Sequence, residues 1–351
     1  MNILNDLSKI EKLDKSNVLG SVDALPEQCL HAWNDVEKIK LDKNYSKINK
    51  IIVCGMGGSA LGPHVIQSIF DIKVPLFINR DYDLPSWTDK QTLVILSSYS
   101  GNTEEVISCT EKSIKKELNL LAISTGGQLL KICQDENIPF YKIIPKYNPS
   151  NQPRMAIGYS IFGQLALLTK TGFLKINKED VISLVEFLKK TKKNIEPKKI
   201  AQEIDGKIPI LIAGRHLNGS IHVFNNQINE NSKNFSAFFY LPELNHHLME
   251  GLSFPKINSE NLIFICFDSL LYKLRVRQRL AITRQVLKKN KIQSLTIELK
   301  GKTKLQQGFE AILIGSYVNF YLAMLNNINP APIPWVDYFK KELKKLPNEK
   351  R

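Results

Sequence analysis

The sequence IIVCGMGGSA, residues 51–60, is an apolar run that ends in three glycines and a serine. Glycines after a strand let backbone N–H groups approach an anion at the start of the following helix. The segment GMGGSA also fits the dinucleotide fingerprint G-x-G-x-x-A, and Asp81 or Asp83 lies near the place of a ribose-binding acid. Taken alone, this stretch leaves a dinucleotide, a sugar phosphate and a simple tight turn open.

A second polar loop, SSYSGNTEE at residues 97–105, places the hydroxyls of Ser98, Ser100 and Thr103 around a glycine at the start of the next helix. A phosphate monoester has three terminal oxygens and gains from such donors, whereas a pyrophosphate is usually bound by backbone alone. The alternative is that these residues cap a helix and form a turn, where Ser, Asn and Thr are common. The two loops together favour a phosphate site. Its predicted ligands are Gly57, Gly58, Ser59, Ser98, Ser100 and Thr103.

Strand-like runs alternate with helix-like stretches along the first part of the chain, which is typical of a parallel sheet covered by helices. The predicted strands lie in residues 50–55, 74–79, 92–101, 118–127 and 138–144. They are followed by an apolar helix, long enough to be buried, in residues 154–174. An amphipathic helix that begins near Asn177 is predicted in residues 177–195.

The same order of patterns restarts at Ile208, so the chain is predicted to contain two copies of one α/β unit. IPILIAGRHLNGS at 208–220 repeats the strand and its glycines, NLIFICFDS at 261–269 repeats the third strand, and IQSLTIELKG at 292–301 repeats the fourth. The Ser/Thr-rich loop of the first copy is replaced by CFDSLLY in the second. We therefore expect the first copy to bind the anion.

The chain has 351 residues and a formal net charge of +14. Most of this charge comes from lysines in helical runs such as FLKKTKKNIEPKK, and few arginines are present for bidentate contacts with phosphates or bases. Solvated helix faces are favoured over a polyanion partner, so no nucleic acid is expected. A general attraction for anionic substrates remains in either case.

The sequence also supports expectations about localisation, the cysteines and metal binding. No run of about eighteen apolar residues occurs, and the charged N-terminus does not resemble a signal peptide, which predicts a cytoplasmic protein without membrane contact. The five cysteines are scattered without a CxxC spacing, so we expect them to be reduced core residues. The six histidines form no HxH or HExxH group, and no metal site is expected.

Six segments together resemble one enzyme family. They are GMGGS, SYSGNTEE, STGGQL, QPRMAIGY, NQINENSK and ELNHHLMEG. In this order they are similar to the bifunctional phosphoglucose/phosphomannose isomerases, which consist of two sugar isomerase (SIS) domains. The resemblance implies an α/β fold of two doubly wound, flavodoxin-like SIS domains in residues 20–150 and 195–330. Connecting helices would occupy 151–194, and a C-terminal helix in 331–351 would contribute to the site.

The resemblance implies reversible conversion of glucose 6-phosphate or mannose 6-phosphate to fructose 6-phosphate through a cis-enediolate, without a metal or other cofactor. Such a reaction needs a carboxylate base, a group that opens the sugar ring and positive charge near the developing oxyanion. By resemblance, Glu230 is the base and Arg154 faces the enediolate. Read locally, Glu230 is an acid on a polar helix face, and Arg154, between two apolar stretches, is a salt-bridge partner.

Two further residues are implied in ring opening. His246 matches the family pattern ELNH better than His247, although a lone histidine is more often structural. Lys340 matches the family's site lysine, with the adjacent Lys341 as the alternative. At Ala331 many relatives have threonine, a departure that leaves the balance between the glucose and mannose substrates open.

Two other function classes compete with an isomerase. A non-catalytic SIS protein that binds a sugar phosphate and regulates a partner would not need Glu230, His246 and Arg154 together. An NAD-dependent enzyme would use GMGGSA for its cofactor. The resemblance further implies a homodimer in which the histidine comes from the neighbouring chain, and the aromatic segment FFYLPELNHH before His246 suits an interface.

Overall fold

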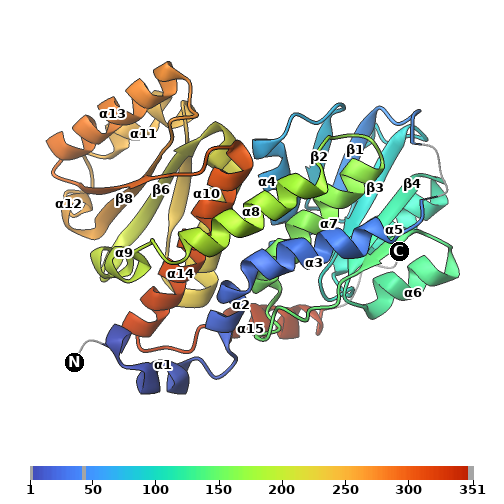
Figure 1. Cartoon of the computed structure of the whole chain (residues 1–351), viewed down its shortest axis with the longest axis horizontal. Coiled ribbons are helices and arrows are strands. Elements are labelled where there is room, and N and C mark those ends of the chain that lie inside the picture. Colours follow the sequence, from blue (N-terminus) through green and yellow to red (C-terminus); the bar gives the residue numbers. More distant parts are fainter. Residues whose placement is uncertain (1–2, 42–44, 347–351) are drawn as a thin grey trace.

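Two parallel sheets lie side by side in the computed structural model, with long helices packed between them (Figure 1). The structure describes residues 3–41 and 45–346. Each sheet forms one copy of the repeated α/β unit, which confirms the α/β fold class and the repeat predicted from the sequence.

The first sheet has five parallel strands in the order β2-β1-β3-β4-β5. This is the strand order of flavodoxin-like folds, in which ligands bind beyond the carboxyl ends of strands where the winding direction changes, here between β1 and β3. The strands agree with the predicted runs. They are β1 (Lys50–Cys54), β2 (Leu76–Asn79), β3 (Thr92–Ser97), β4 (Asn119–Ser124) and β5 (Phe140–Lys142).

The second sheet repeats this arrangement with four strands in the order β7-β6-β8-β9. The strands are β6 (Ile208–Gly214), β7 (Ala237–Leu241), β8 (Leu262–Asp268) and β9 (Gln293–Glu298). The sequence did not predict β7, because its aromatic residues lie beside a proline and resemble an exposed segment. It is an edge strand paired in parallel with β6, and its first four residues are only half-buried.

Helices cover both faces of the first sheet. The buried helix and the amphipathic helix predicted after the sheet both form, and Asn177 caps the latter in a capping box with Asp180. The helices of this half are α1 (Leu7–Leu13), α2 (Val18–Asp23), α3 (Leu25–Glu37), α4 (Gly58–Ile69), α5 (Glu104–Lys115), α6 (Gly127–Asp135), α7 (Ile157–Lys170) and α8 (Lys178–Thr191).

The second half is covered in the same manner, and short helical turns carry several of the predicted site residues. The helices are α9 (Pro197–Ile204), α10 (Asn218–Gln227), α11 (Leu248–Gly251), α12 (Asn258–Asn261), α13 (Leu274–Lys289), α14 (Lys304–Leu325) and α15 (Pro334–Leu343). The turns are η1 (Ile3–Asn5), η2 (Pro153–Met155), η3 (Arg215–Leu217), η4 (Ile228–Ser232) and η5 (Glu243–His246).

Helix α14 belongs to the cores of both halves. Phe309 and Phe320 pack in the core of the first half, whereas Ile314 and Leu322 pack in that of the second. By length and composition alone α14 would be apolar enough to cross a membrane, but 89% of the relevant window is buried inside the protein. It is therefore a shared core helix that holds the two halves together.

Helices α4 and α10 also join the halves, because they cross at very short range. A Cβ atom on Gly219 of α10 would lie 2.5 Å from the Cα of Val65 in α4, so this position accepts only glycine without a shift of backbone. The Gly219 N–H donates to Ser68 Oγ at 2.9 Å. The start of α10 is thereby fixed against the second half of α4.

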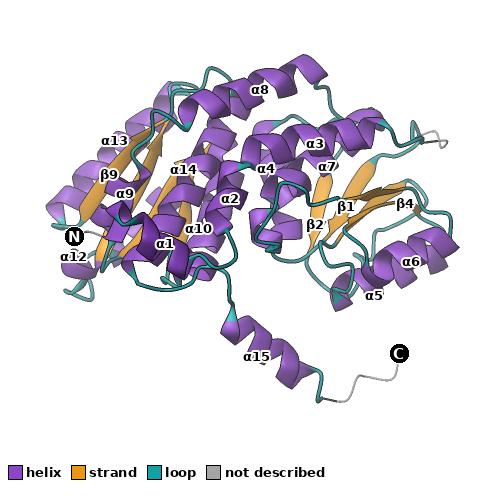
Figure 2. Cartoon of the chain, turned by 60° about the horizontal axis from the view of Figure 1, so that its bottom comes forward, coloured by secondary structure: helices purple, strands orange, loops and turns teal. Residues whose placement is uncertain are grey.

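The C-terminal helix α15 stands away from the rest of the chain (Figure 2). None of its residues is buried, and Trp335 is 80% exposed. The predicted C-terminal helix therefore exists at Pro334–Leu343, but within one chain it packs on neither sheet. Residues 347–351 of the predicted segment lie outside the described residues.

Candidate active site

The two glycine- and hydroxyl-bearing loops meet at the carboxyl ends of β1 and β3. The Tyr99 N–H donates to Ser59 Oγ at 3.1 Å, which ties the second loop to the first. Within the second loop, Ser98 Oγ lies 2.8 Å from Thr103 Oγ1 and accepts from the Gly101 N–H at 3.0 Å. The structure therefore brings the predicted phosphate ligands of both loops together, with Ser98 buried and Ser100 exposed.

Helices α4 and α5 both begin at these loops without a side-chain cap. The residue before α4, Gly57, has φ +50° and open space within 4 Å of the place that a Cβ would take, and Thr103 before α5 makes no capping bond. Unsatisfied N–H groups at a helix start are a ready site for an anion, and the helix dipole favours negative charge there. This geometry suits a phosphate group.

The corresponding loop of the second half is occupied by the chain's own side chains. Gln307 of α14 contacts His216 Nε2 at 2.9 Å and accepts from Ser269 Oγ at 2.5 Å. The Tyr272 hydroxyl accepts from the Gly214 N–H at 3.0 Å. Three polar groups of the second half are thus bonded within the chain, whereas Ser220 Oγ, the counterpart of Ser59, is buried without a hydrogen-bond partner among the described residues.

Arg154 lies directly beside the first loop. A Cβ atom on Gly58 would be 3.5 Å from the Arg154 Cα, so the loop and η2 are in contact. The Arg154 side chain is 3% exposed, and burial lowers its pKa. A buried guanidinium needs partners, as the sequence predicted.

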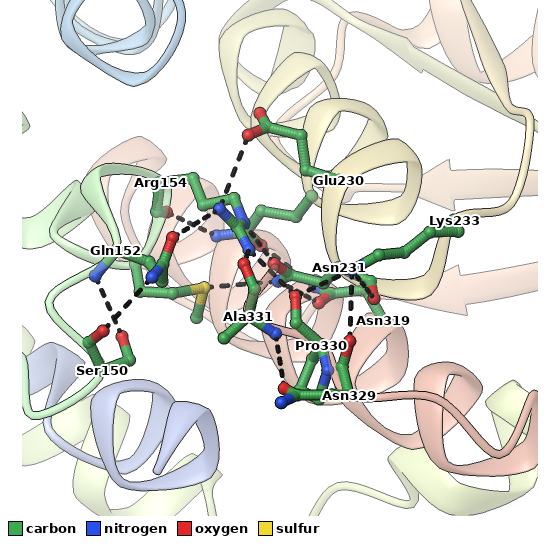
Figure 3. A network of polar contacts seen from close by, with 12 residues as sticks. Ser150, Gln152, Arg154, Glu230, Asn231, Lys233, Asn319, Asn329, Pro330 and Ala331 are labelled. Atoms are coloured by element: carbon green, nitrogen blue, oxygen red, sulfur yellow. Dashed lines mark hydrogen bonds and ion pairs between the residues drawn. The ribbon is translucent and has the colours of Figure 1, made fainter. Parts of the chain in front are cut away.

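Four hydrogen bonds and one ion pair hold the Arg154 guanidinium, which has five N–H donors (Figure 3). Nε donates to Asn231 Oδ1, and Nη1 donates to Gln152 Oε1 at 2.9 Å. Nη2 donates to the carbonyl oxygens of Pro330 and Ala331 at 2.9 and 2.7 Å. A carboxylate oxygen of Glu230 completes the set at 3.7 Å from Nη1.

Glu230 projects from η4, a π-helical turn that continues α10. Its side chain is 31% exposed and points toward Arg154 (Figure 3). Burial raises the pKa of Glu230, and the charges of Arg154, Lys233 and Lys340 act in the opposite direction. A carboxylate with a raised pKa beside a fixed cation has the properties of a general base next to an oxyanion stabiliser.

Lys340 is the member of the predicted pair whose charge reaches the site. It lies on α15, and its charge lowers the pKa of Glu230, whereas the neighbouring Lys341 is not among the groups that do so. Both side chains are exposed. Asp337, also on α15, acts on the pKa of Arg154 in the opposite direction to burial.

The chain places Glu230 and His246 on opposite sides of strand β7 in sequence. Glu230 precedes β7 and His246 follows it in η5, so the five-residue strand separates the two positions. Such a strand spans about 16 Å. His246 and the adjacent His247 are both exposed.

Sequence reasoning missed Lys233, Gln152 and Asn231 as members of this network. Lys233 Nζ donates to three backbone carbonyls, and Gln152 and Asn231 hold the Arg154 guanidinium. All three residues lie in the segments QPRMAIGY and NQINENSK that carried the resemblance. Their proximity to the predicted base and cation in sequence was the available signal.

The other sequence expectations concern metals, cysteines and a dinucleotide. Within residues 3–41 and 45–346, no cluster of three or more His, Cys, Asp or Glu side chains is placed to hold a metal ion. All five cysteines are free and buried. Asp83, a candidate ribose ligand, is ion-paired with Lys112 of α5.

The chain is similar in sequence to known sugar-phosphate isomerases. Residues 193–343 match the family model described as the bacterial phospho-glucose isomerase C-terminal SIS domain. A bifunctional phosphoglucose/phosphomannose isomerase of Caldicellulosiruptor bescii is 32% identical over 349 residues, covering 93% of this chain and 98% of the relative. One of the same name from Thermoplasma volcanium is 33% identical over 314 residues, covering 88% and 96%.

A solved structure shows the same fold at much lower sequence identity. Tagatose-6-phosphate ketose/aldose isomerase from Escherichia coli superposes with a TM-score of 0.67 at 14% identity, covering 90% of this chain and 95% of that one. The two-sheet architecture is thus shared with a phosphosugar isomerase.

Proposed function

Because the chain belongs to the bifunctional phosphoglucose/phosphomannose isomerase family, we propose that it interconverts glucose 6-phosphate or mannose 6-phosphate with fructose 6-phosphate. Membership in the family makes the chain a sugar-phosphate isomerase. The choice of hexose, the proton-transfer mechanism and the roles of individual residues are the proposed parts.

The observation that carries the proposal is the pairing of Arg154 with Glu230 beside the first-half loops. The uncapped starts of α4 and α5 would hold the substrate phosphate, with Ser59, Ser100 and Thr103 as hydroxyl donors. Phosphate binding at a fixed point directs the sugar carbons toward Arg154 and Glu230. Positioning of this kind lowers the entropic cost of reaching the transition state.

Proton transfer would be carried out by Glu230. Its carboxylate removes the proton from C2 of the open-chain aldose and returns it to C1, and the reverse steps convert the ketose. The Arg154 guanidinium stabilises the negative oxygen of the cis-enediolate between these steps. Nη1 makes a single hydrogen bond, to Gln152, and lies 3.7 Å from Glu230, so the substrate oxygen would bind at Nη1.

The ring-opening group His246 would come from a second copy of the chain. The position of His246 after β7, with Glu230 before it, supports this proposal. Exposure of both histidines is compatible with their entry into a neighbouring site. Lys340 on α15 would assist ring opening beside them. The proposed assembly is a symmetric homodimer.

A coupled assay tests the proposed function. Formation of fructose 6-phosphate is measured separately from glucose 6-phosphate and mannose 6-phosphate, with and without EDTA. We expect product from at least one hexose phosphate and equal rates in EDTA, because proton transfer between carboxylate and carbon needs no metal. The absence of product from both sugars would refute the isomerase proposal for this chain.

A further inference from the structure

The segment Asn329–Ala331, which leads into α15, is held to the Glu230 turn by two cations. Lys233 Nζ donates to the carbonyl oxygens of Asn329 at 3.3 Å and Pro330 at 3.0 Å. Arg154 Nη2 donates to the carbonyls of Pro330 and Ala331. The Pro330 carbonyl thus accepts from both cations (Figure 3).

The third donor of Lys233 returns to its own turn. Nζ donates to the Asn231 carbonyl at 3.2 Å, and Asn231 in turn receives the Nε–H of Arg154 through its side chain. Lys233 has φ +54°, a left-handed backbone conformation that is uncommon outside glycine. This conformation ends η4. The residue in this left-handed conformation is therefore the one whose side chain joins two segments of the site, the Glu230 turn and Asn329–Ala331.

On the premise of the proposed isomerase function, we propose that Lys233 is a positioning residue. Its ammonium group fastens the Asn329–Ala331 segment to the turn that carries Glu230, which keeps the Arg154 guanidinium against the Glu230 carboxylate. It also places a second positive charge beside that carboxylate, in addition to Arg154. Arg154 holds the same segment from η2, whereas Lys233 is the cation that holds it from the Glu230 turn itself.

The charged groups around Lys233 affect the pH at which its ammonium group loses a proton. The charges of Arg154 on η2 and Glu230 on η4 affect the pKa of Lys233. On α15, Asp337 affects the pKa of Arg154 and Lys340 affects that of Glu230. Burial, and then the Arg154 charge, lower the pKa of Lys233 to about 8. An ammonium has three donors and a neutral amine has two, so deprotonation leaves one of the three carbonyls without a partner.

The first test compares Lys233→Arg and Lys233→Met with wild type in pH profiles of kcat/KM. The guanidinium of Lys233→Arg stays charged, so the decline in activity on the alkaline side moves to higher pH. Lys233→Met lacks the charge at every pH, so the decline on the acid side, set by Glu230, also moves to higher pH. We expect its kcat/KM to fall by about tenfold to a hundredfold, as for a small misplacement of catalytic groups.

Lys207→Met is the matched control, because Lys207 Nζ also donates to a backbone carbonyl, that of Glu260, at 2.8 Å away from the site. Its pH profile should coincide with that of wild type. An unchanged alkaline limb in Lys233→Arg, or an unchanged acid limb in Lys233→Met, would overturn the electrostatic part of the proposal.

The second test needs no substrate. Amide hydrogen exchange of residues 326–337 is measured in the free protein, together with exchange in β3 as a measure of global stability. We expect faster exchange of 326–337 in Lys233→Met, wild-type exchange in Lys207→Met and substantial recovery in Lys233→Arg. Unchanged exchange in Lys233→Met would overturn the fastening, as would acceleration spread equally over β3. Faster local exchange in a protein without isomerase activity would retain the fastening and reject the proposed function.

Discussion

Arg154 and Glu230 form a pair in which burial and charge act on both members. Burial lowers the pKa of Arg154 and raises that of Glu230, and the attraction between them opposes each change. Removal of one member leaves the other partly buried without its charge partner, which usually costs more than the pair contributes. Stability of each variant at this pair must therefore be measured together with its activity.

Glu230→Gln removes the proposed base and keeps the size of the side chain. We expect turnover and exchange of the C2 proton with deuterated water to fall together, by about a hundredfold or more. In wild type, kcat/KM should decline on the acid side at a pH above the ordinary glutamate pKa, because burial raises the pKa of Glu230 and the base acts only when ionised. Normal C2 exchange in folded Glu230→Gln would identify another base.

Ser100→Ala and Thr103→Val test the phosphate loop. The phosphate is bound alike in the ground state and the transition state, so KM for hexose phosphate should rise more than kcat falls. Loss of one hydrogen bond to a charged group costs about 1.5 to 3 kcal/mol. Steady-state kinetics on both variants measure the effect. Unchanged KM in both variants would remove these hydroxyls from the site.

Among the helices, the crossing of α4 and α10 depends on one glycine. Gly219→Ala places a methyl group 2.5 Å from the Val65 Cα, so the helices must separate. Overpacking of this kind costs about 1 to 3 kcal/mol, and we expect a lower Tm in thermal unfolding. Gly251→Ala is the control, because a Cβ there has nothing within 4 Å. Equal Tm values for the two variants would contradict the role given to Gly219.

The sequence predicted most of these elements because their local patterns are strong. Five strands of the first sheet and the capped start of α8 were recognisable from apolar runs and from Asn177. Strand β7 was missed because an edge strand with half-buried aromatics lacks the continuous apolar run of a central strand. Lys233 was missed because its partners Asn329 and Pro330 are almost a hundred positions away, and such contacts depend on tertiary packing.

For the whole molecule, the structure of one chain leaves the proposed site open. The loops, Arg154 and Glu230 converge, whereas His246 lies beyond β7 and α15 has no buried residue. Trp335 and Phe339 of α15 are 80% and 62% exposed, which is unusual for large aromatic side chains in a finished assembly. These features agree with the proposal that a second copy completes the site.

Whether the site is built from two chains is tested most directly by co-refolding Glu230→Ala chains with His246→Ala chains. A mixed dimer would contain one site with both residues and one with neither. Random pairing makes about half of the dimers mixed, and each mixed dimer has one intact site of two. We therefore predict that the mixture of two inactive parents recovers up to about a quarter of wild-type activity. A mixture as inactive as its parents, although mixed dimers are shown to form, would contradict the shared site.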